Sequence, residues 1–215
     1  MQSILIYGGS FDPPHLGHLN TALNVQRYFH FDKIIFLPCK IPVLKNPTKA
    51  SAQDRIKMLQ LMLKNYPEFS ISTAEIDRET PSYMTETLKS LREQLESTNN
   101  PSVSMSLLLG MDALINLPQW HQFEKIPTLC NLLIIKRHGI SKKNYPEILK
   151  KMFNSPCQHA RDLLESRNGK LVFFDAGQYP ISSTALREKI QHKETINNEL
   201  PDAVHDYINQ HGLYL

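Results

Sequence analysis

Residues 4–18 read Ile-Leu-Ile-Tyr-Gly-Gly-Ser-Phe-Asp-Pro-Pro-His-Leu-Gly-His, a short apolar strand that runs into a glycine turn and then into a helix. Glycines at positions 8 and 9 let the backbone approach a phosphate closely and present N–H groups to it. The N-terminus of the helix adds N–H donors and a partial positive charge at the same place. His15 and His18 project from roughly one face of that helix. The stretch therefore predicts a site that binds a polyphosphate.

Two other interpretations of this stretch are open at this point. A glycine turn followed by two ordinary surface histidines would explain a Gly-Gly pair on its own. Gly17 argues against it, because glycine costs about 1 kcal/mol where a helix is being nucleated, and this cost suggests a ligand lying against the backbone. A metal site on both histidines lacks a second pair of ligands nearby, and the sequence contains no Cys-x-x-Cys.

Short, continuous apolar runs alternate with helical patterns along the chain. Such runs are typical of parallel strands covered on both faces. The predicted strands are Ile4–Tyr7, Lys33–Leu37, Phe69–Thr73, Ser106–Leu109, Leu132–Lys136 and Leu171–Phe174. Stripes of leucine and isoleucine at helical spacing lie between them, over residues 16–23, 56–63 and 88–95. We expect an α/β fold with a doubly wound, Rossmann-like, mostly parallel sheet that binds ligands at the C-terminal ends of its strands.

Helix boundary signals complete this organisation. Ser51, followed three residues later by Asp54, resembles a capping box. Towards the C-terminus, Ser182 or Ser183 is a candidate N-cap, and a last helix begins at Pro201. We interpret residues 176–215 as a small helical appendix of one domain that spans residues 1–215.

Composition points to an ordinary globular protein. Apolar residues make up 41% of the chain and charged residues 21%. A net charge of +3 is too small to argue for a nucleic acid or an anionic membrane as partner. Three scattered cysteines fit reduced thiols, and the N-terminus lacks the basic region of a signal peptide, so we expect a cytoplasmic protein. The sequence contains no apolar stretch of the roughly 20 residues that a membrane span needs.

Several motifs, taken together, resemble one family. The first and last of them are specific only as a pair. The motifs are Gly8 to His18, Pro38 to Lys45, Pro81-Ser82-Tyr83, Gly110-x-Asp112 with Trp120, Ile181-Ser182-Ser183-Thr184 with Arg187, and the tail from Tyr207 to Tyr214. Nearly end to end, the chain resembles the bacterial nicotinate-nucleotide adenylyltransferase family, which carries the His-x-Gly-His signature of the nucleotidyltransferases.

The resemblance implies an activity and a set of site residues. The family transfers AMP from ATP to nicotinate mononucleotide, giving nicotinate adenine dinucleotide and pyrophosphate in NAD biosynthesis. His18 and His15 would be catalytic, and Mg²⁺ would be carried with ATP, with no metal ligand from the protein. ATP would be bound by Gly9, Ser10, His15, His18, Gly110, Asp112, Ser183, Thr184 and Arg187. Nicotinate mononucleotide would be bound by Lys45, Tyr83, Met84 and Trp120.

The chain departs from the family pattern at two places. The family commonly has Pro-Pro-His-Lys where this chain has Pro42-Val43-Leu44-Lys45, so only the lysine carries over. The family also tends to have threonine where this chain has Met84, which loses a hydroxyl and keeps a backbone N–H. Ser82 is read as the N-cap of the helix there. The amides of Tyr83 and Met84 could then receive the nicotinate carboxylate, with no acidic residue immediately beside them.

Each remaining motif has a structural alternative. Asp112 would accept from ribose hydroxyls by resemblance, but it could also be an N-cap. Trp120, the sole tryptophan, would stack on the pyridine ring or serve as a half-buried packing residue. The Ser183 motif could be an ordinary capped helix with Arg187 on its surface. At the level of function, the rivals are phosphopantetheine adenylyltransferase, a silent adenine-nucleotide sensor and a fragment of a class I aminoacyl-tRNA synthetase. The sequence does not predict the oligomeric state.

Overall fold

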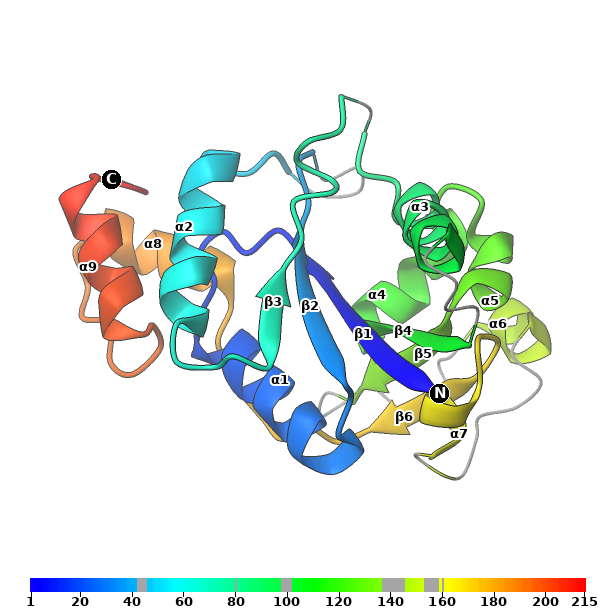
Figure 1. Cartoon of the computed structure of the whole chain (residues 1–215). Coiled ribbons are helices and arrows are strands. Elements are labelled where there is room, and N and C mark those ends of the chain that lie inside the picture. Colours follow the sequence, from blue (N-terminus) through cyan, green and yellow to red (C-terminus); the bar gives the residue numbers. More distant parts are fainter. Residues whose placement is uncertain (42–45, 80, 98–101, 137–145, 153–158, 160) are drawn as a thin grey trace.

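A parallel sheet forms the centre of the computed structural model (Figure 1). The structure describes residues 1–41, 46–79, 81–97, 102–136, 146–152, 159 and 161–215. Within these residues, six strands pair in the order β3-β2-β1-β4-β5-β6, and every pairing is parallel. The strands are β1 (Gln2–Gly9), β2 (Lys33–Pro38), β3 (Phe69–Ile71), β4 (Val103–Gly110), β5 (Asn131–Ile135) and β6 (Leu171–Phe174). All six predicted strands are confirmed, although β1 and β4 are longer than expected and β3 ends two residues earlier.

Helices follow most strands, as the alternating pattern predicts. Ser51 caps the second helix by accepting a hydrogen bond from the Asp54 N–H at 3.1 Å, as expected. The longer helices are α1 (Leu16–Phe29), α2 (Ala52–Leu63), α3 (Met84–Ser97), α8 (Ser183–Gln191) and α9 (Asp202–Gln210). The shorter ones are α4 (Met111–Asn116), η1 (Leu117–Gln119), η2 (Phe123–Lys125), α5 (Ile126–Leu129), α6 (Glu147–Met152) and α7 (Arg161–Glu165). No helix of the described residues is both long and apolar enough to cross a bilayer.

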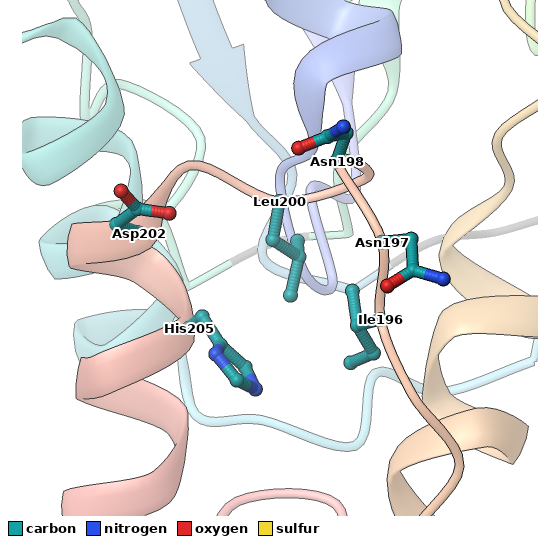
Figure 2. Close-up of a pocket in the computed structure, with 6 residues that line it drawn as sticks. All are labelled: Ile196, Asn197, Asn198, Leu200, Asp202 and His205. Carbon is teal, nitrogen blue, oxygen red and sulfur yellow. The ribbon is translucent and has the colours of Figure 1, made fainter.

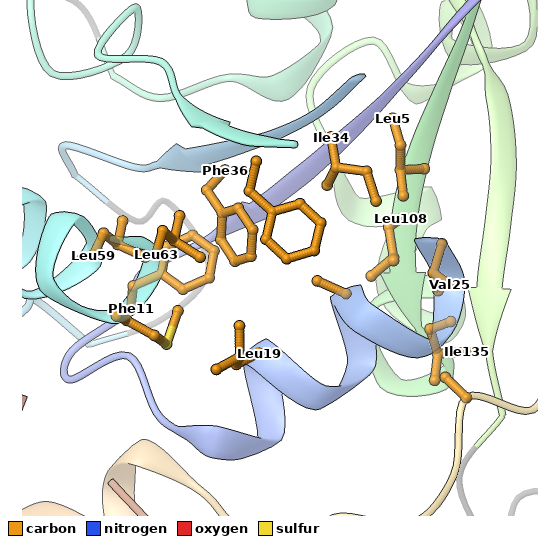
Figure 3. Close-up of a cluster of buried hydrophobic side chains, with 14 of the residues drawn as sticks. Leu5, Phe11, Leu19, Val25, Ile34, Phe36, Leu59, Leu63, Leu108 and Ile135 are labelled. Carbon is orange, nitrogen blue, oxygen red and sulfur yellow. The ribbon is translucent and has the colours of Figure 1, made fainter. Parts of the chain in front are cut away.

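Alternating side chains of the strands build two cores, one on each face of the sheet, because successive residues of a strand point to opposite faces. Leu5 packs with residues of α1, α2, α8 and α9 in the first core, part of which Figure 3 shows. Ile4 and Ile6 pack with residues of α3, α4, α5 and α6 in the second. Both faces are therefore covered, which explains why the strands are continuous apolar runs.

The C-terminal helices contribute to the first core. Ser182 caps α8 by accepting from the Ala185 N–H at 3.1 Å, which decides between the two candidate caps. Pro201 is the N-cap of α9, as the sequence indicates. Buried Leu186 of α8 and Val204 of α9 belong to the same cluster as the strand residues of this face.

The strand order places two glycine motifs side by side. Successive connections proceed in one direction from β1 to β3 and in the other from β4 to β6, so the order reverses between β1 and β4. Open sheets of this kind bind ligands at that point, beyond the carboxyl ends of the strands. Tyr7 of β1 pairs with Leu108 of β4. The glycines that end β1 and Gly110 at the end of β4 therefore open into the same place, as predicted.

Candidate active site

The two histidines of the first motif form one stacked unit at the start of α1. Their ring centroids are 3.7 Å apart, with the planes inclined by 27°. The backbone N–H of His15 donates to Nδ1 of His18 at 3.2 Å. A ring that accepts at Nδ1 carries its proton on Nε2 in the neutral form. The arrangement therefore makes His18 a donor through Nε2.

His15 has a different environment from His18. It is 5% exposed, while His18 is half-buried and its ring also meets the edge of Phe11 at a centroid distance of 5.0 Å. The Phe11 side chain packs in turn against the Gly9 backbone, where an added Cβ would lie 3.0 Å from the ring. His15 thus supports the position of the His18 ring. Its predicted contact with ATP stays a prediction.

Gly17 has a packing explanation. A Cβ on this residue would lie 2.9 Å from Nδ1 of His15 and 3.4 Å from Cβ of Tyr179. The suggestion that a ligand lies against this backbone is not needed, because the His15 ring already occupies the space. Glycine is required here so that His15 can fold back against the first turn of α1.

Two amides of the first turn of α1 are engaged within the protein. The Leu16 N–H donates to the Glu199 carbonyl at 2.9 Å, and the His18 N–H donates to the His15 carbonyl at 2.9 Å. The sequence predicts unpaired N–H donors at this helix end, and that prediction is wrong for the N–H groups of Leu16 and His18. The predicted contact of the His18 side chain with a phosphate stays a prediction.

Asp12 is the structural centre of the turn, and sequence reasoning did not single it out. Its carboxylate is 3% exposed and accepts from the Lys49 N–H at 2.7 Å and the Ala50 N–H at 3.1 Å. The Tyr214 hydroxyl donates to the same carboxylate at 2.8 Å. Burial, followed by the charge of Asp12 and this hydrogen bond, raises the pKa of Tyr214, while Arg187 and Arg55 oppose the rise. Tyr214, near the end of the sequence, is thereby fixed to the turn after β1.

The second phosphate motif also meets this turn. Nη1 of Arg187 donates to the Asp12 carbonyl at 2.7 Å and lies 3.9 Å from its carboxylate, and Nη2 donates to Thr184 at 3.3 Å. The Ser183 hydroxyl donates to the Pro13 carbonyl at 2.9 Å, so this hydroxyl ties the two motifs together. Thr184 is exposed beside them. Arg187 thus contacts the turn after β1 and is not an isolated surface arginine, while its predicted contact with a phosphate stays a prediction.

A cavity of about 260 Å³ opens beside this junction. It is lined by Lys49, Thr184, Arg187, Glu188, Gln191, Tyr214 and Leu215. A second cavity of about 260 Å³ lies between α9 and the segment before it, as Figure 2 shows. Its lining is Ile196, Asn197, Asn198, Leu200, Asp202 and His205, and none of these is a predicted site residue.

Arg55 is a second residue that sequence reasoning missed. It is fully buried on α2, and Nη1 donates to the Ser10 carbonyl at 2.7 Å. A buried guanidinium is costly unless its donors are hydrogen-bonded, and the Ser10 carbonyl accepts from one of them. An arginine on the apolar face of a predicted helix was the available signal. Arg55 holds Ser10 in the turn after β1 through its hydrogen bond to the Ser10 backbone carbonyl.

Asp112 is the second residue of α4, and the N-cap is Gly110, so the N-cap alternative for Asp112 is wrong. The Asp112 side chain is exposed and bends back over the glycine, where an added Cβ would lie 2.6 Å from Oδ1. Gly110 is therefore required for this carboxylate position at the end of β4. The predicted ribose contact stays a prediction.

Of the predicted mononucleotide residues, Met84 lies at the end of β1. An added Cβ on Gly8 would lie 2.8 Å from Cε of Met84, so the first turn of α3 rests over the glycine turn. The rings of Tyr83 and His121 are 4.4 Å apart, and Thr85 donates to the His121 carbonyl at 2.7 Å. These contacts join α3 to the segment that carries Trp120, which is partly buried against the second core. Lys45 lies outside the described residues.

The predicted cap of α3 is wrong. The helix begins at Met84, and the Ser82 hydroxyl accepts instead from the Lys40 N–H at 3.0 Å. The Tyr83 N–H donates to the Pro81 carbonyl at 2.8 Å and so is engaged. Glu86 lies within the first turn of α3, the turn whose amides are expected to receive the carboxylate. The amides of Met84 and Thr85 are the first-turn donors of this helix.

Among the residues that the structure describes, no group of three His, Cys, Asp or Glu side chains is placed to hold a metal ion. Asp12 is the carboxylate at the glycine turn, and backbone amides and the Tyr214 hydroxyl already engage both of its oxygens.

Comparisons with known proteins agree with this geometry. The family model described as cytidylyltransferase-like matches residues 6–189. A curated relative from Legionella pneumophila (strain Lens), named "Probable nicotinate-nucleotide adenylyltransferase", is 45% identical over 100% of both chains. A relative of the same name from Shewanella frigidimarina is 35% identical over 97% of this chain and 98% of its own. Plasmodium falciparum nicotinic acid mononucleotide adenylyltransferase complexed with NaAD superposes with a TM-score of 0.72 over 100% of this chain and 98% of that chain. At 20% identity, this similarity concerns the fold.

Proposed function

The chain belongs to the nicotinate-nucleotide adenylyltransferase family, within the cytidylyltransferase-like proteins, and from this premise we propose how its residues bind the two substrates. The enzyme transfers AMP from ATP to nicotinate mononucleotide, which yields nicotinate adenine dinucleotide and pyrophosphate. The observation that carries the residue assignment is the junction at Asp12. There the glycine turn, the stacked histidines and the Arg187 motif come together at the end of β1.

The reaction is an in-line displacement at the α-phosphorus of ATP. An oxygen of the mononucleotide phosphate forms a bond to this phosphorus while the bond to the bridging oxygen of pyrophosphate breaks. Positioning and stabilisation of charge on the phosphoryl oxygens supply most of the acceleration in such transfers. Nε2 of His18 donates to an α-phosphate oxygen on which charge develops. His15 holds the His18 ring in place because the two rings stack and the His15 N–H donates to Nδ1 of His18.

The polyphosphate of ATP extends from the glycine turn towards α8. Gly9 and Ser10 line the turn, and Arg187 and Thr184 face the cavity beside it. Arginine suits this position because its planar fork matches phosphate oxygens. Mg²⁺ carried with ATP would neutralise charge on its phosphates, and no ligand for it is assigned to the protein. At the end of β4, Gly110 lets the nucleoside pack closely and Asp112 accepts from the ribose hydroxyls.

Nicotinate mononucleotide binds between α3 and the segment after α4. The first-turn amides of α3, at Met84 and Thr85, receive the carboxylate of the pyridine ring. Trp120 stacks on that ring, and Tyr83 lines the pocket beside His121. Lys45 completes the phosphate contacts of this substrate. The Met84 side chain over Gly8 brings this pocket within reach of the α-phosphorus.

We expect kcat/KM for nicotinate mononucleotide to exceed that for nicotinamide mononucleotide by at least roughly tenfold. An amide in the carboxylate position would turn an NH₂ group towards a helix N–H, a mismatch that costs on the order of 1–3 kcal/mol. Pyrophosphate release from purified protein with ATP and Mg²⁺ measures this ratio. Phosphopantetheine serves as the third acceptor, to test the rival adenylyltransferase. Equal efficiency with both mononucleotides contradicts acid specificity, and turnover of phosphopantetheine alone contradicts the acceptor assignment.

Replacement of Trp120 by alanine is expected to weaken use of nicotinate mononucleotide and to leave ATP binding nearly unchanged. Stacking on a ring is worth about 1–3 kcal/mol, which corresponds to roughly 5–150-fold in KM. Trp120→Phe keeps an aromatic face and is expected to retain most of the affinity. Because Trp120 is the sole tryptophan, its fluorescence reports binding directly. An emission spectrum that saturating mononucleotide does not change would favour the packing role.

A further inference from the structure

Glu75 is a buried carboxylate between β3 and α3 that no step of the reaction uses. Its side chain is 2% exposed, and Oε1 accepts from the Thr87 hydroxyl at 2.9 Å. The Ser82 side chain hydrogen-bonds the same carboxylate. Burial raises the pKa of Glu75, while these two hydrogen bonds and the charge of Arg78 oppose the rise. The carboxylate is therefore held in place by two hydroxyl groups from different segments.

Ser82 extends this network to the end of β2. Its Oγ accepts from the Lys40 N–H at 3.0 Å and from the Ile41 N–H at 3.4 Å. A serine hydroxyl has one proton to donate and two lone pairs that accept. With both amides donating to the oxygen, the proton is directed to Glu75. Glu75 thus fixes the orientation of the Ser82 hydroxyl. In that orientation, Ser82 accepts from the backbone N–H groups that follow β2.

A parallel set of contacts strengthens the same connection. Nζ of Lys40 donates to the Arg78 carbonyl at 2.7 Å, and Nη1 of Arg78 donates to Thr87 at 3.3 Å. Thr87 is itself fully buried on α3. Three segments that are separated in the sequence are thereby joined by polar side chains. They are the end of β2, the connection from β3, and the first turns of α3.

This network adjoins the proposed mononucleotide pocket. Ser82 directly precedes Tyr83 and Met84, and Thr87 lies one turn further along α3. A buried charged group is not explained by its contribution to stability alone, because apolar side chains of similar volume commonly stabilise a protein equally well. Satisfied polar networks instead hold a unique geometry. The geometry held here is the position of the first turn of α3 relative to the glycine turn, where Met84 meets Gly8.

We propose that Glu75, acting through Ser82 and Thr87, is a positioning residue for nicotinate mononucleotide that sets where the first turn of α3 meets the pyridine ring. The inference rests on the proposed function, because it assigns the network to the acceptor side of that reaction. Glu75 touches neither substrate in this scheme. It determines affinity for the acceptor, while binding of ATP and stabilisation of the transferring phosphoryl group depend on the junction at Asp12.

The sharpest test compares Thr87→Val with Thr87→Ser. Valine has the shape of threonine without the hydroxyl, whereas serine keeps the donor to Glu75. We expect Thr87→Val to raise KM for nicotinate mononucleotide by about tenfold, the scale of one lost hydrogen bond to a charged group. Both kcat and KM for ATP should stay within about twofold of the wild-type values on the same scale. Thr87→Ser should restore KM to near the wild-type value.

Two further variants separate positioning from general destabilisation. Ser82→Ala removes the other hydroxyl and should raise the same KM with the same selectivity. Ser104→Ala removes a fully buried hydroxyl of β4 that donates to the Leu163 carbonyl of α7, and it should change thermal stability without changing the ratio of the two KM values. Titration of Trp120 fluorescence with nicotinate mononucleotide checks the affinity without turnover.

The outcomes distinguish this inference from the function on which it rests. Wild-type protein that does not adenylylate nicotinate mononucleotide contradicts the proposed function, and the inference fails with it. Wild-type activity with an unchanged acceptor KM in both Thr87→Val and Ser82→Ala overturns the inference alone. An equal rise in KM for both substrates, or a fall in kcat that Thr87→Ser does not reverse, also overturns it.

Discussion

Replacement of His18 by alanine is expected to lower kcat by roughly 10²–10³-fold, the scale for loss of one preorganised donor to developing charge. The structure gives the reason, since the His15 N–H donates to Nδ1 of His18 and leaves the proton on Nε2, and the stacked His15 ring holds this orientation. The donor is therefore in place before the reaction begins. The affinity for ATP should change much less, because the interaction strengthens as charge develops.

Steady-state kinetics with ATP, Mg²⁺ and nicotinate mononucleotide measure this effect. His205→Ala, which removes an imidazole from α9, serves as the control and should retain the wild-type kcat. Near-normal turnover by a folded His18→Ala protein would remove His18 from the mechanism. A rise in KM for ATP at constant kcat would assign His18 to ground-state binding instead.

Replacement of Asp12 by alanine is expected to destabilise the protein by about 3–5 kcal/mol, the usual cost of removing one partner from a buried charged network. For a chain of this length, that cost corresponds to a fall in Tm of roughly 6–20 °C. The carboxylate accepts from two backbone amides and the Tyr214 hydroxyl, and all three lose their acceptor. Arg187 would also lose the negative charge that lies 3.9 Å from its guanidinium.

Thermal unfolding followed by circular dichroism tests this expectation. Tyr214→Phe is the matched control, because it removes one of the donors and keeps the ring. Its cost should be about 1–3 kcal/mol, the range for one hydrogen bond to a charged group. A Tm for Asp12→Ala that matches the Tm of Tyr214→Phe would show that the carboxylate does not hold the turn together.

Local patterns predicted most of the fold. The six strands are apolar runs whose length and composition are typical of a covered parallel sheet, and each of them lies where it was expected. Ser51 at the start of α2 and Pro201 at the start of α9 were recognisable because capping involves neighbours within one turn. The relative placement of the glycine motifs also followed, since parallel strands present their carboxyl ends at one edge.

The site could be predicted only in part. The motif residues were recognisable by resemblance, but Glu75 and His121 carry no local signature, and Arg55 carries only a weak one. Each acts through a partner that is distant in the sequence. Arg55 contacts the turn from 45 positions away, and Thr85 meets the His121 carbonyl across 36 positions. A buried charged residue on an otherwise apolar helix face is the one signal that could have pointed to Arg55.

The sequence by itself determined the sheet, the glycine turn at its switch point, the family and the pair of histidines. Tertiary structure decided what individual polar groups do. The Ser82 hydroxyl accepts from the Lys40 N–H after β2 and does not cap its own helix. Gly17 leaves the space that the His15 ring occupies. Tertiary structure also brought Tyr214 to Asp12 across 202 positions of the chain. Strands and caps are set by interactions among near neighbours, whereas the partner of a hydroxyl or a carboxylate is chosen only when the folded chain brings distant segments together.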